Sequence, residues 1–88
     1  MHYYIQNKEV IQSKIGDEVV MLDVESGYYF GLNSVASVIW DLMKEKINLN
    51  SMVESLMQEY DIDKETCEAD TLELLEKMIE KKIIRIVE

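Results

Sequence analysis

The residues that interrupt helices and strands are confined to one end of this sequence. It contains no proline, and its three glycines, Gly16, Gly27 and Gly31, all fall within the first 31 of 88 residues. Glycine marks turns and bulges, whereas a long segment without glycine or proline can form uninterrupted helices. This asymmetry predicts turns and strands in the first third of the chain and helices in the rest.

The first third contains three short apolar or β-branched segments separated by turn residues. "VIQSKI" (10–15) and "EVVMLD" (18–23) flank a Gly-Asp pair that suits a two-residue hairpin turn. "VESG" (24–27) then turns the chain into "YYFGL" (28–32). These segments predict a three-stranded antiparallel meander.

Three helices are predicted after the meander, each beginning at a residue that can cap a helix: Asn33 or Ser34, Asn48, and Asp63. Apolar residues then recur at helical spacing. In the first helix the expected buried stripe is Val35, Val38, Ile39, Leu42 and Met43, widened by Ala36 and Trp40. In the second helix it is Leu49, Met52, Val53, Leu56 and Met57, closed by Tyr60.

The third helix, expected to run to about Lys82, has more apolar positions than one stripe needs. One line consists of Cys67, Thr71, Leu74, Leu75 and Met78. A second, offset line consists of Leu72, Leu75, Ile79 and Ile83. The second line is therefore expected to be exposed or to belong to a groove.

The two ends of the chain are less clearly patterned. "HYYIQ" (2–6) either adds an edge strand or packs loosely, and "IIRIV" (83–87) forms either a final strand or the end of a helix. No repeat or linker divides the chain, so residues 1–88 are expected to form a single domain. The predicted fold class is α+β, a winged helix-turn-helix with the three-stranded antiparallel sheet preceding the three helices.

The charge of the chain disfavours nucleic acid as a partner. The net charge is −9, and between residues 54 and 76 nine acidic residues face a single base, Lys64. This field repels phosphate backbones and attracts basic peptides or basic protein surfaces. No apolar segment is long enough to cross a membrane and the first residues do not resemble a signal peptide, so a cytoplasmic protein is expected.

Residues that carry catalytic or metal chemistry are sparse. The sequence has no glycine-rich phosphate loop, no HExxH and no CxxC motif, and His2 is the single histidine. Without an internal histidine, neither a serine nor a cysteine nucleophile has an evident base. Cys67 is interpreted as a small buried apolar residue. We therefore expect no enzymatic activity, no cofactor and no metal site.

The segment "GYYFGL" contains more aromatic residues than one face of a strand can bury. Side chains alternate faces along a strand, so Tyr28, Phe30 and Leu32 share one face, and Tyr29 and Gly31 the other. If Leu32 points to the core, Tyr29 points away from it. The third strand of a meander also has one unpaired edge, which can accept an added strand.

In these segments the sequence resembles the PqqD-like family, small domains also called RiPP recognition elements. The resemblance covers roughly residues 10–86. Its most specific part is the pattern L-D-x-x-S-G-x-Y-F-x-L-N-x-x-A-x-x-I-W at residues 22–40, followed by "EYDID" (59–63) and an acidic residue at Asp70. Lys82 stands where the family usually has a glycine near the end of the third helix.

The resemblance implies a non-catalytic module that binds the leader segment of a ribosomally synthesised precursor peptide. The leader would add as a strand beside the third strand, with its side chains in a groove formed with the third helix. The domain would present the precursor to a modifying enzyme, either a radical-SAM protein or a protease and cyclase. The implied peptide-binding residues are Tyr28, Tyr29, Phe30 and Gly31 on the strand, and Asp70, Thr71, Leu72, Leu74, Leu75, Glu76, Met78 and Ile79 on the helix.

Two other interpretations of the residues remain open. A winged-helix regulator that binds DNA would need a basic recognition helix, and bases gather only near the C-terminus, at Lys77, Lys81, Lys82 and Arg85. A structural subunit would instead bury the aromatic edge in a homodimer. The chain is accordingly expected to be a monomer or a homodimer.

Overall fold

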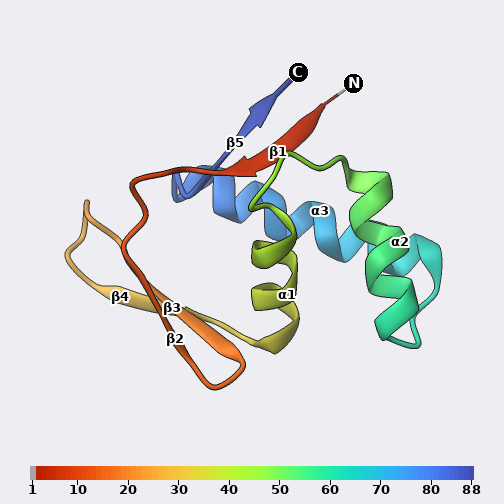
Figure 1. Cartoon of the computed structure of the whole chain (residues 1–88), viewed down its shortest axis with the longest axis horizontal. Coiled ribbons are helices and arrows are strands. Elements are labelled where there is room, and N and C mark those ends of the chain that lie inside the picture. The colour runs from red at the N-terminus through yellow and green to blue at the C-terminus, as the bar shows by residue number, and fades with distance from the viewer. Residues whose placement is uncertain (1) are drawn as a thin grey trace.

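The computed structural model describes residues 2–88, which form five strands and three helices (Figure 1). The strands are β1 (Tyr3–Gln6), β2 (Gln12–Ile15), β3 (Glu18–Leu22), β4 (Tyr29–Leu32) and β5 (Ile84–Val87). The helices are α1 (Ser34–Leu42), α2 (Leu49–Glu59) and α3 (Lys64–Glu80). A three-stranded antiparallel sheet followed by three helices confirms the predicted α+β class.

Strands β2, β3 and β4 form the predicted meander, with β3 in the middle. Ile15 pairs with Glu18 across a two-residue turn, and Leu22 pairs with Tyr29 across a longer one. Gly16 has a φ of 62°, a backbone conformation that side-chain-bearing residues rarely adopt, which explains glycine at this tight turn.

The two ends of the chain pair with each other in a second, separate sheet. Tyr3 lies opposite Val87 and Gln6 opposite Ile84 in the antiparallel β1–β5 pair. The segment 2–6 is therefore a strand, but it does not extend the meander, and the segment 83–87 is a strand rather than a helix end. On its other side β1 makes an isolated bridge from Tyr4 to Ile47.

All three helices begin at capping residues that the sequence identifies. The side chains of Asn33, Asn48 and Asp63 accept hydrogen bonds from the backbone N–H groups three residues later, which satisfies otherwise unpaired donors. For α1 the structure selects Asn33 rather than Ser34. In Figure 1 the meander and α2 lie on opposite sides of α1, with both chain ends at the top.

Helix α3 ends earlier than predicted, at Glu80, and Lys82 takes the left-handed conformation, with a φ of 63°. The N–H of Ile83 donates to the carbonyl of Met78, and the N–H of Lys82 donates to that of Ile79. This is the Schellman arrangement, in which glycine usually occupies the left-handed position. Lys82 thus adopts the conformation that glycine usually takes at the end of a helix.

The core consists of the inner face of the meander and one face of each helix. Its buried apolar residues are Val19, Met21, Leu32, Ala36, Ile39, Trp40, Met43, Met52, Val53, Leu56, Cys67, Leu75, Met78, Ile83 and Ile84. The buried face of α1 is rotated from the predicted stripe: Ser37 is buried, whereas Val35 is 43% exposed. Within residues 2–88, no helix combines the length and apolar character needed to span a membrane.

Candidate functional site

The outer edge of β4 is the first element of the candidate site. Among the described residues no strand pairs with this edge, because β4 is the last strand of the meander. The N–H of Asp23 donates to the carbonyl of Tyr28, so the pair of Tyr28 and Asp23 is a hydrogen-bonded one. Such pairs alternate along an antiparallel ladder. The N–H and C=O groups of Tyr29 and Gly31 therefore point away from β3, toward the open edge.

The aromatic residues of β4 separate as the alternation predicts. Leu32 is buried and Phe30 packs partly buried against the core, whereas Tyr29 on the other face is 69% exposed. Tyr28 directly precedes the strand and is 77% exposed, so it is not buried with Phe30. Two tyrosines are thus accessible at the start of the open edge.

The C-terminal end of α3 lies against β4. Lys81 Nζ is 4.6 Å from the centroid of the Phe30 ring, a cation–π distance, and 4.0 Å from the carboxylate of Asp23. The pKa of Asp23 lies below its ordinary value, mainly because the backbone N–H of Glu25 donates to its carboxylate. Hydrogen bonds from Ser26 and the charge of Lys81 act in the same direction. Helix α3 and β4 therefore face each other across a charged and aromatic contact.

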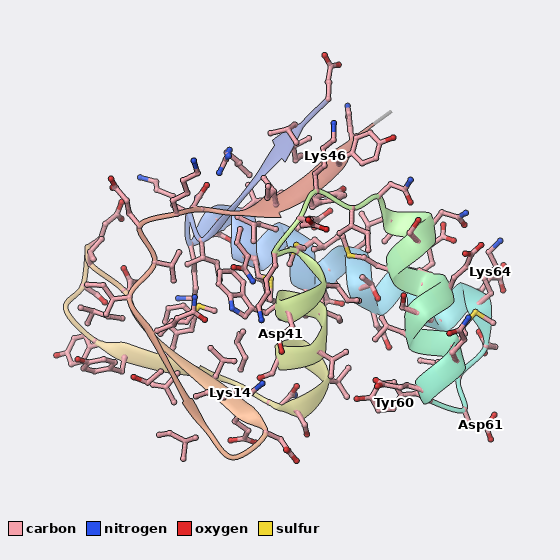
Figure 2. All side chains as sticks on the ribbon, viewed as in Figure 1. Lys14, Asp41, Lys46, Tyr60, Asp61 and Lys64 are labelled. Carbon is pink, nitrogen blue, oxygen red and sulfur yellow. The ribbon has the colours of Figure 1, made fainter. Side chains whose placement is uncertain are left out.

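An apolar cavity of about 490 Å³ opens where β4 ends. It is formed by the start of α1, the end of α2 and the first half of α3, and its lining comprises Asn33, Val35, Ala36, Ile39, Leu56, Tyr60, Asp61, Ile62, Cys67, Asp70, Thr71 and Leu74. Asn33 directly follows β4, so a chain lying along the β4 edge would continue over this cavity. Tyr60 at the C-terminal end of α2 points toward α1, and Asp61 follows it in the turn after the helix (Figure 2).

Helix α3 presents only one of its two flanks to the cavity. Asp70 and Leu74 line it. Leu72 lies roughly 160° from Leu74 around the helix axis, since successive residues are about 100° apart. It lines a different, smaller depression together with Lys64 and other residues of the same helix.

The site residues that the sequence predicts on α3 lie on different sides of the helix. Leu72, Glu76 and Ile79 lie on the flank away from the cavity. Thr71, Leu75 and Met78 are buried, each no more than 2% exposed, so they belong mainly to the core. Only Asp70, Thr71 and Leu74 of the predicted helix residues line the cavity.

Several cavity residues were not identified from the sequence as site residues. The helical spacing assigns Val35 to the buried stripe of α1 and Tyr60 to the end of the α2 stripe. Only their positions in the sequence indicate a role in the site. Val35 lies in the first turn of α1, directly after the exposed strand, and Tyr60 precedes the acidic turn before α3. Both positions depend on how the helices pack, which local periodicity does not specify.

A larger and more polar depression, of about 600 Å³, lies at the other end of β3. Most of its cationic groups already have partners within the protein. Lys82 Nζ lies 2.7 Å from Glu25, Lys81 lies 4.0 Å from Asp23, and Arg85 donates to the carbonyl of Gln6 at 3.2 Å. We therefore assign the candidate site to the smaller apolar cavity, which adjoins the open edge.

The described residues do not assemble an evident reactive centre. Within residues 2–88 no cluster of three or more histidine, cysteine, aspartate or glutamate side chains is placed to hold a metal ion. Cys67 is buried at 2% exposure, as the sequence predicted. An open strand edge beside an apolar cavity is suited to holding an extended peptide.

Comparison with known proteins identifies one family and two solved structures that are similar to this chain. Residues 18–84 match the model of the PqqD family, described as Coenzyme PQQ synthesis protein D. No curated protein matches the chain. A solved structure of TbiB1 in complex with the TbiA(beta) leader peptide is 33% identical, covers 92% of this chain and 94% of its own, and superposes with a TM-score of 0.81.

A second solved structure has the same fold. It is a lasso peptide synthetase B1 complexed with the leader peptide, 22% identical to this chain, with a TM-score of 0.80. The similarity covers 93% of this chain and 96% of that one.

Proposed function

Because the chain belongs to the PqqD family, we propose that it binds the leader segment of a ribosomally synthesised precursor peptide and presents it to a modifying enzyme. The observation that carries this proposal is the open edge of β4 beside an apolar cavity. Support also comes from TbiB1, which is 33% identical and whose structure is a complex with a leader peptide.

The leader adds to the meander as a strand beside β4. Its backbone pairs with the outward N–H and C=O groups of Tyr29 and Gly31, which have no strand partner among the described residues. Backbone pairing supplies affinity with little demand on sequence. Gly31 carries no side chain, and a Cβ built there would meet no other atom within 4 Å, so the sheet face that points away from the core is open at this position.

Selectivity for particular leaders comes from side-chain contacts at both ends of β4. At its start, Tyr28, Tyr29 and Phe30 offer aromatic surface. Beyond its end, the apolar cavity accepts one or two apolar leader side chains against Leu74 of α3.

The charges around the cavity favour a leader that is basic or polar at this point. Asp61 and Asp70 lie in the cavity lining, which contains no lysine or arginine. Opposite charges placed across an interface raise the association rate and disfavour partners with the wrong charge. An acidic leader residue at the cavity would be repelled by both carboxylates.

The chain contributes binding, and the chemistry belongs to the enzyme that it serves. That enzyme is a radical-SAM protein or a protease acting with a cyclase, as the resemblance of the sequence implies. On this proposal the domain raises the local concentration of the precursor at the enzyme, in the same way that any tethered second site does.

The test is an isothermal titration calorimetry experiment in which the purified protein is titrated with the leader peptide encoded beside its gene. Saturable binding tighter than roughly 100 μM, about −5.5 kcal/mol, is expected. Amide hydrogen exchange then tests the mode of binding. The amides of Tyr29 and Gly31 should exchange fast in the free protein and become protected by the leader, whereas the amide of Phe30 should be protected in both states. Absence of saturable binding would overturn the proposal.

A further inference from the structure

The face of the meander that points away from the helices is apolar. Since Val19, Met21 and Leu32 are buried, strand alternation directs their neighbours in sequence to the opposite side. Leu22 donates its backbone N–H to Ile11, which fixes Ile11 opposite Leu22 on the same side. We call this surface the outer sheet face, and its apolar residues are Ile11, Ile15, Val20, Leu22 and Tyr29.

This surface is exposed to a degree that is unusual for a sheet with one covered face. The solvent side of such an antiparallel sheet normally carries polar side chains. Here Ile11 is 54% exposed, Ile15 is 68% exposed and Tyr29 is 69% exposed. Ile11 and Ile15 come from the first segment of the sheet and Tyr29 from β4, and the half-buried Val20 and Leu22 of β3 lie between them. Together the five residues form one contiguous surface. Contiguous apolar surface of this kind marks an interaction site.

The charges at the β2–β3 turn end of the outer sheet face are acidic. Glu18 lies on this face, because it pairs with Ile15, and Asp17 lies in the adjoining turn. Lys14 is the one base between residues 11 and 32. It points to the other side, where its Nζ lies 3.4 Å from Asp41 of α1 (Figure 2). An occupant with lysine or arginine beside an apolar patch is therefore complementary.

A second copy of this chain is a poor occupant. A two-fold dimer through the outer sheet face would bring equivalent surfaces together, with Asp17 and Glu18 of each copy at the shared interface. The net charge of −9 adds general repulsion between copies. The surface instead fits a different protein with a basic border.

We propose that the outer sheet face is the docking surface for the modifying enzyme, whose contact region is apolar and flanked by lysine or arginine. This inference rests on the proposed leader-binding function. A leader added beside β4 extends the same sheet, so its outward side chains become part of the outer sheet face next to Tyr29 and Gly31. An enzyme seated on this surface contacts the chain and the leader together.

This continuity couples the two binding events. The enzyme binds the leader-loaded protein more tightly than the free protein, and by linkage the enzyme raises the affinity for the leader by the same factor. Strands β3 and β4 separate Ile11 and Ile15 from the leader, so the effect of these residues on enzyme docking is separable from leader binding.

The experiment uses the full chain, the leader peptide and the purified modifying enzyme encoded beside the gene. The variant carries Ile11→Lys and Ile15→Lys, which removes apolar surface and opposes a basic border. A matched control carries Met57→Lys and Ile86→Lys, which change residues that are 41% and 45% exposed on other surfaces. Leader affinity is measured by calorimetry, and enzyme affinity by surface plasmon resonance with and without leader.

The variant with Ile11→Lys and Ile15→Lys is expected to keep its leader affinity within twofold and to lose enzyme affinity at least tenfold, while the control keeps both affinities. Equal enzyme affinity of the variant and the control, with leader binding intact, would overturn this inference and leave the proposed function standing. Absence of leader binding in the unsubstituted protein would instead overturn the proposed function.

Two further measurements test which protein binds the outer sheet face. Asp17→Lys with Glu18→Lys should weaken enzyme binding more than Glu54→Lys with Glu59→Lys, because only the first pair borders the outer sheet face. Light scattering should give the mass of a monomer. A dimer that the Ile11→Lys and Ile15→Lys substitutions dissociate would assign this surface to a second copy and overturn the inference.

Discussion

Ser37 of α1 accepts a hydrogen bond from the backbone N–H of Val19 in β3, with 3.0 Å between nitrogen and Oγ. The same hydroxyl donates to the carbonyl of Leu32 in β4 at 3.1 Å. One buried serine thus joins the two strands at the end of their ladder and attaches α1 to both. The site depends on this junction, because β4 provides the open edge and α1 lines the cavity.

We predict that Ser37→Ala destabilises the fold by about 1–3 kcal/mol, since it leaves a buried N–H and a buried C=O without their partner. Urea denaturation measures the effect. Ser13→Ala changes an exposed serine of β2 and should alter the free energy of unfolding by less than about 0.5 kcal/mol. Equal effects of the two substitutions would contradict the bridging role.

Gly31→Pro should abolish leader binding while leaving the protein folded. The N–H of Gly31 points to the open edge, so proline removes a donor that β3 does not use, as is tolerated on edge strands. Circular dichroism checks the fold and calorimetry checks binding. Gly31→Val is the matched variant: it keeps the N–H, its Cβ meets no atom within 4 Å, and its leader affinity should remain within a few-fold. Full binding by folded Gly31→Pro would exclude strand addition at this edge.

Leu74→Ala should weaken leader binding about tenfold, which corresponds to about 1.4 kcal/mol, because it removes apolar contact from the cavity lining. Leu72→Ala is an internal control on the same helix, since both leucines are half-buried and they lie on opposite flanks. Titration of both variants with the leader measures the difference. A larger loss for Leu72→Ala would move the groove to the other flank of α3.

The difference between these leucines shows where sequence reasoning reached its limit. Periodicity predicted that α3 has two apolar lines, and the structure confirms that one of them is buried. Periodicity does not specify which flank of α3 faces β4, because that depends on how α3 is rotated about its axis against the sheet. Burial of Ser37 in place of Val35 on α1 has the same origin: tertiary packing and a hydrogen-bonded serine select the buried face.

The ends of the chain illustrate a different limit. Each of β1 and β5 has only four residues, and their partners are separated by nearly the whole sequence. Local pattern indicates that such segments can form strands but carries no information on pairing. The meander and the helix caps were predictable because adjacent turns and capping side chains act within a few residues.

Acid should weaken the fold through Asp63. Hydrogen bonds from the backbone N–H and the hydroxyl of Thr66 lower the pKa of Asp63 below its ordinary value of 3.8. A depressed carboxyl pKa contributes stability above pH 3.8, and this contribution is lost as pH falls through the folded-state pKa. Asp63→Asn keeps a capping oxygen without titrating. Its melting temperature should therefore fall less than that of the unsubstituted protein between pH 5 and about pH 2.

Lys82→Gly should act on stability in two opposite ways. Glycine relieves the left-handed backbone of Lys82, but the substitution removes the 2.7 Å ion pair with Glu25. Salt screens the exposed pair and leaves the backbone effect unchanged. The melting temperature of Lys82→Gly relative to the unsubstituted protein should therefore rise with sodium chloride. Glu25→Gln, which loses only the pair, should show a deficit that shrinks with salt and never becomes a gain.

The β1–β5 pair brings Tyr3 and Val87 opposite each other, so both ends of the fold leave from one place. A domain with adjacent ends can be inserted into a surface loop of another protein without forcing the loop apart. The open edge of β4 belongs to a different sheet, so the pairing of β1 with β5 leaves it free of a strand partner among the described residues. The same module can therefore be carried as a separate protein or within a larger one, with no change to the open edge of β4.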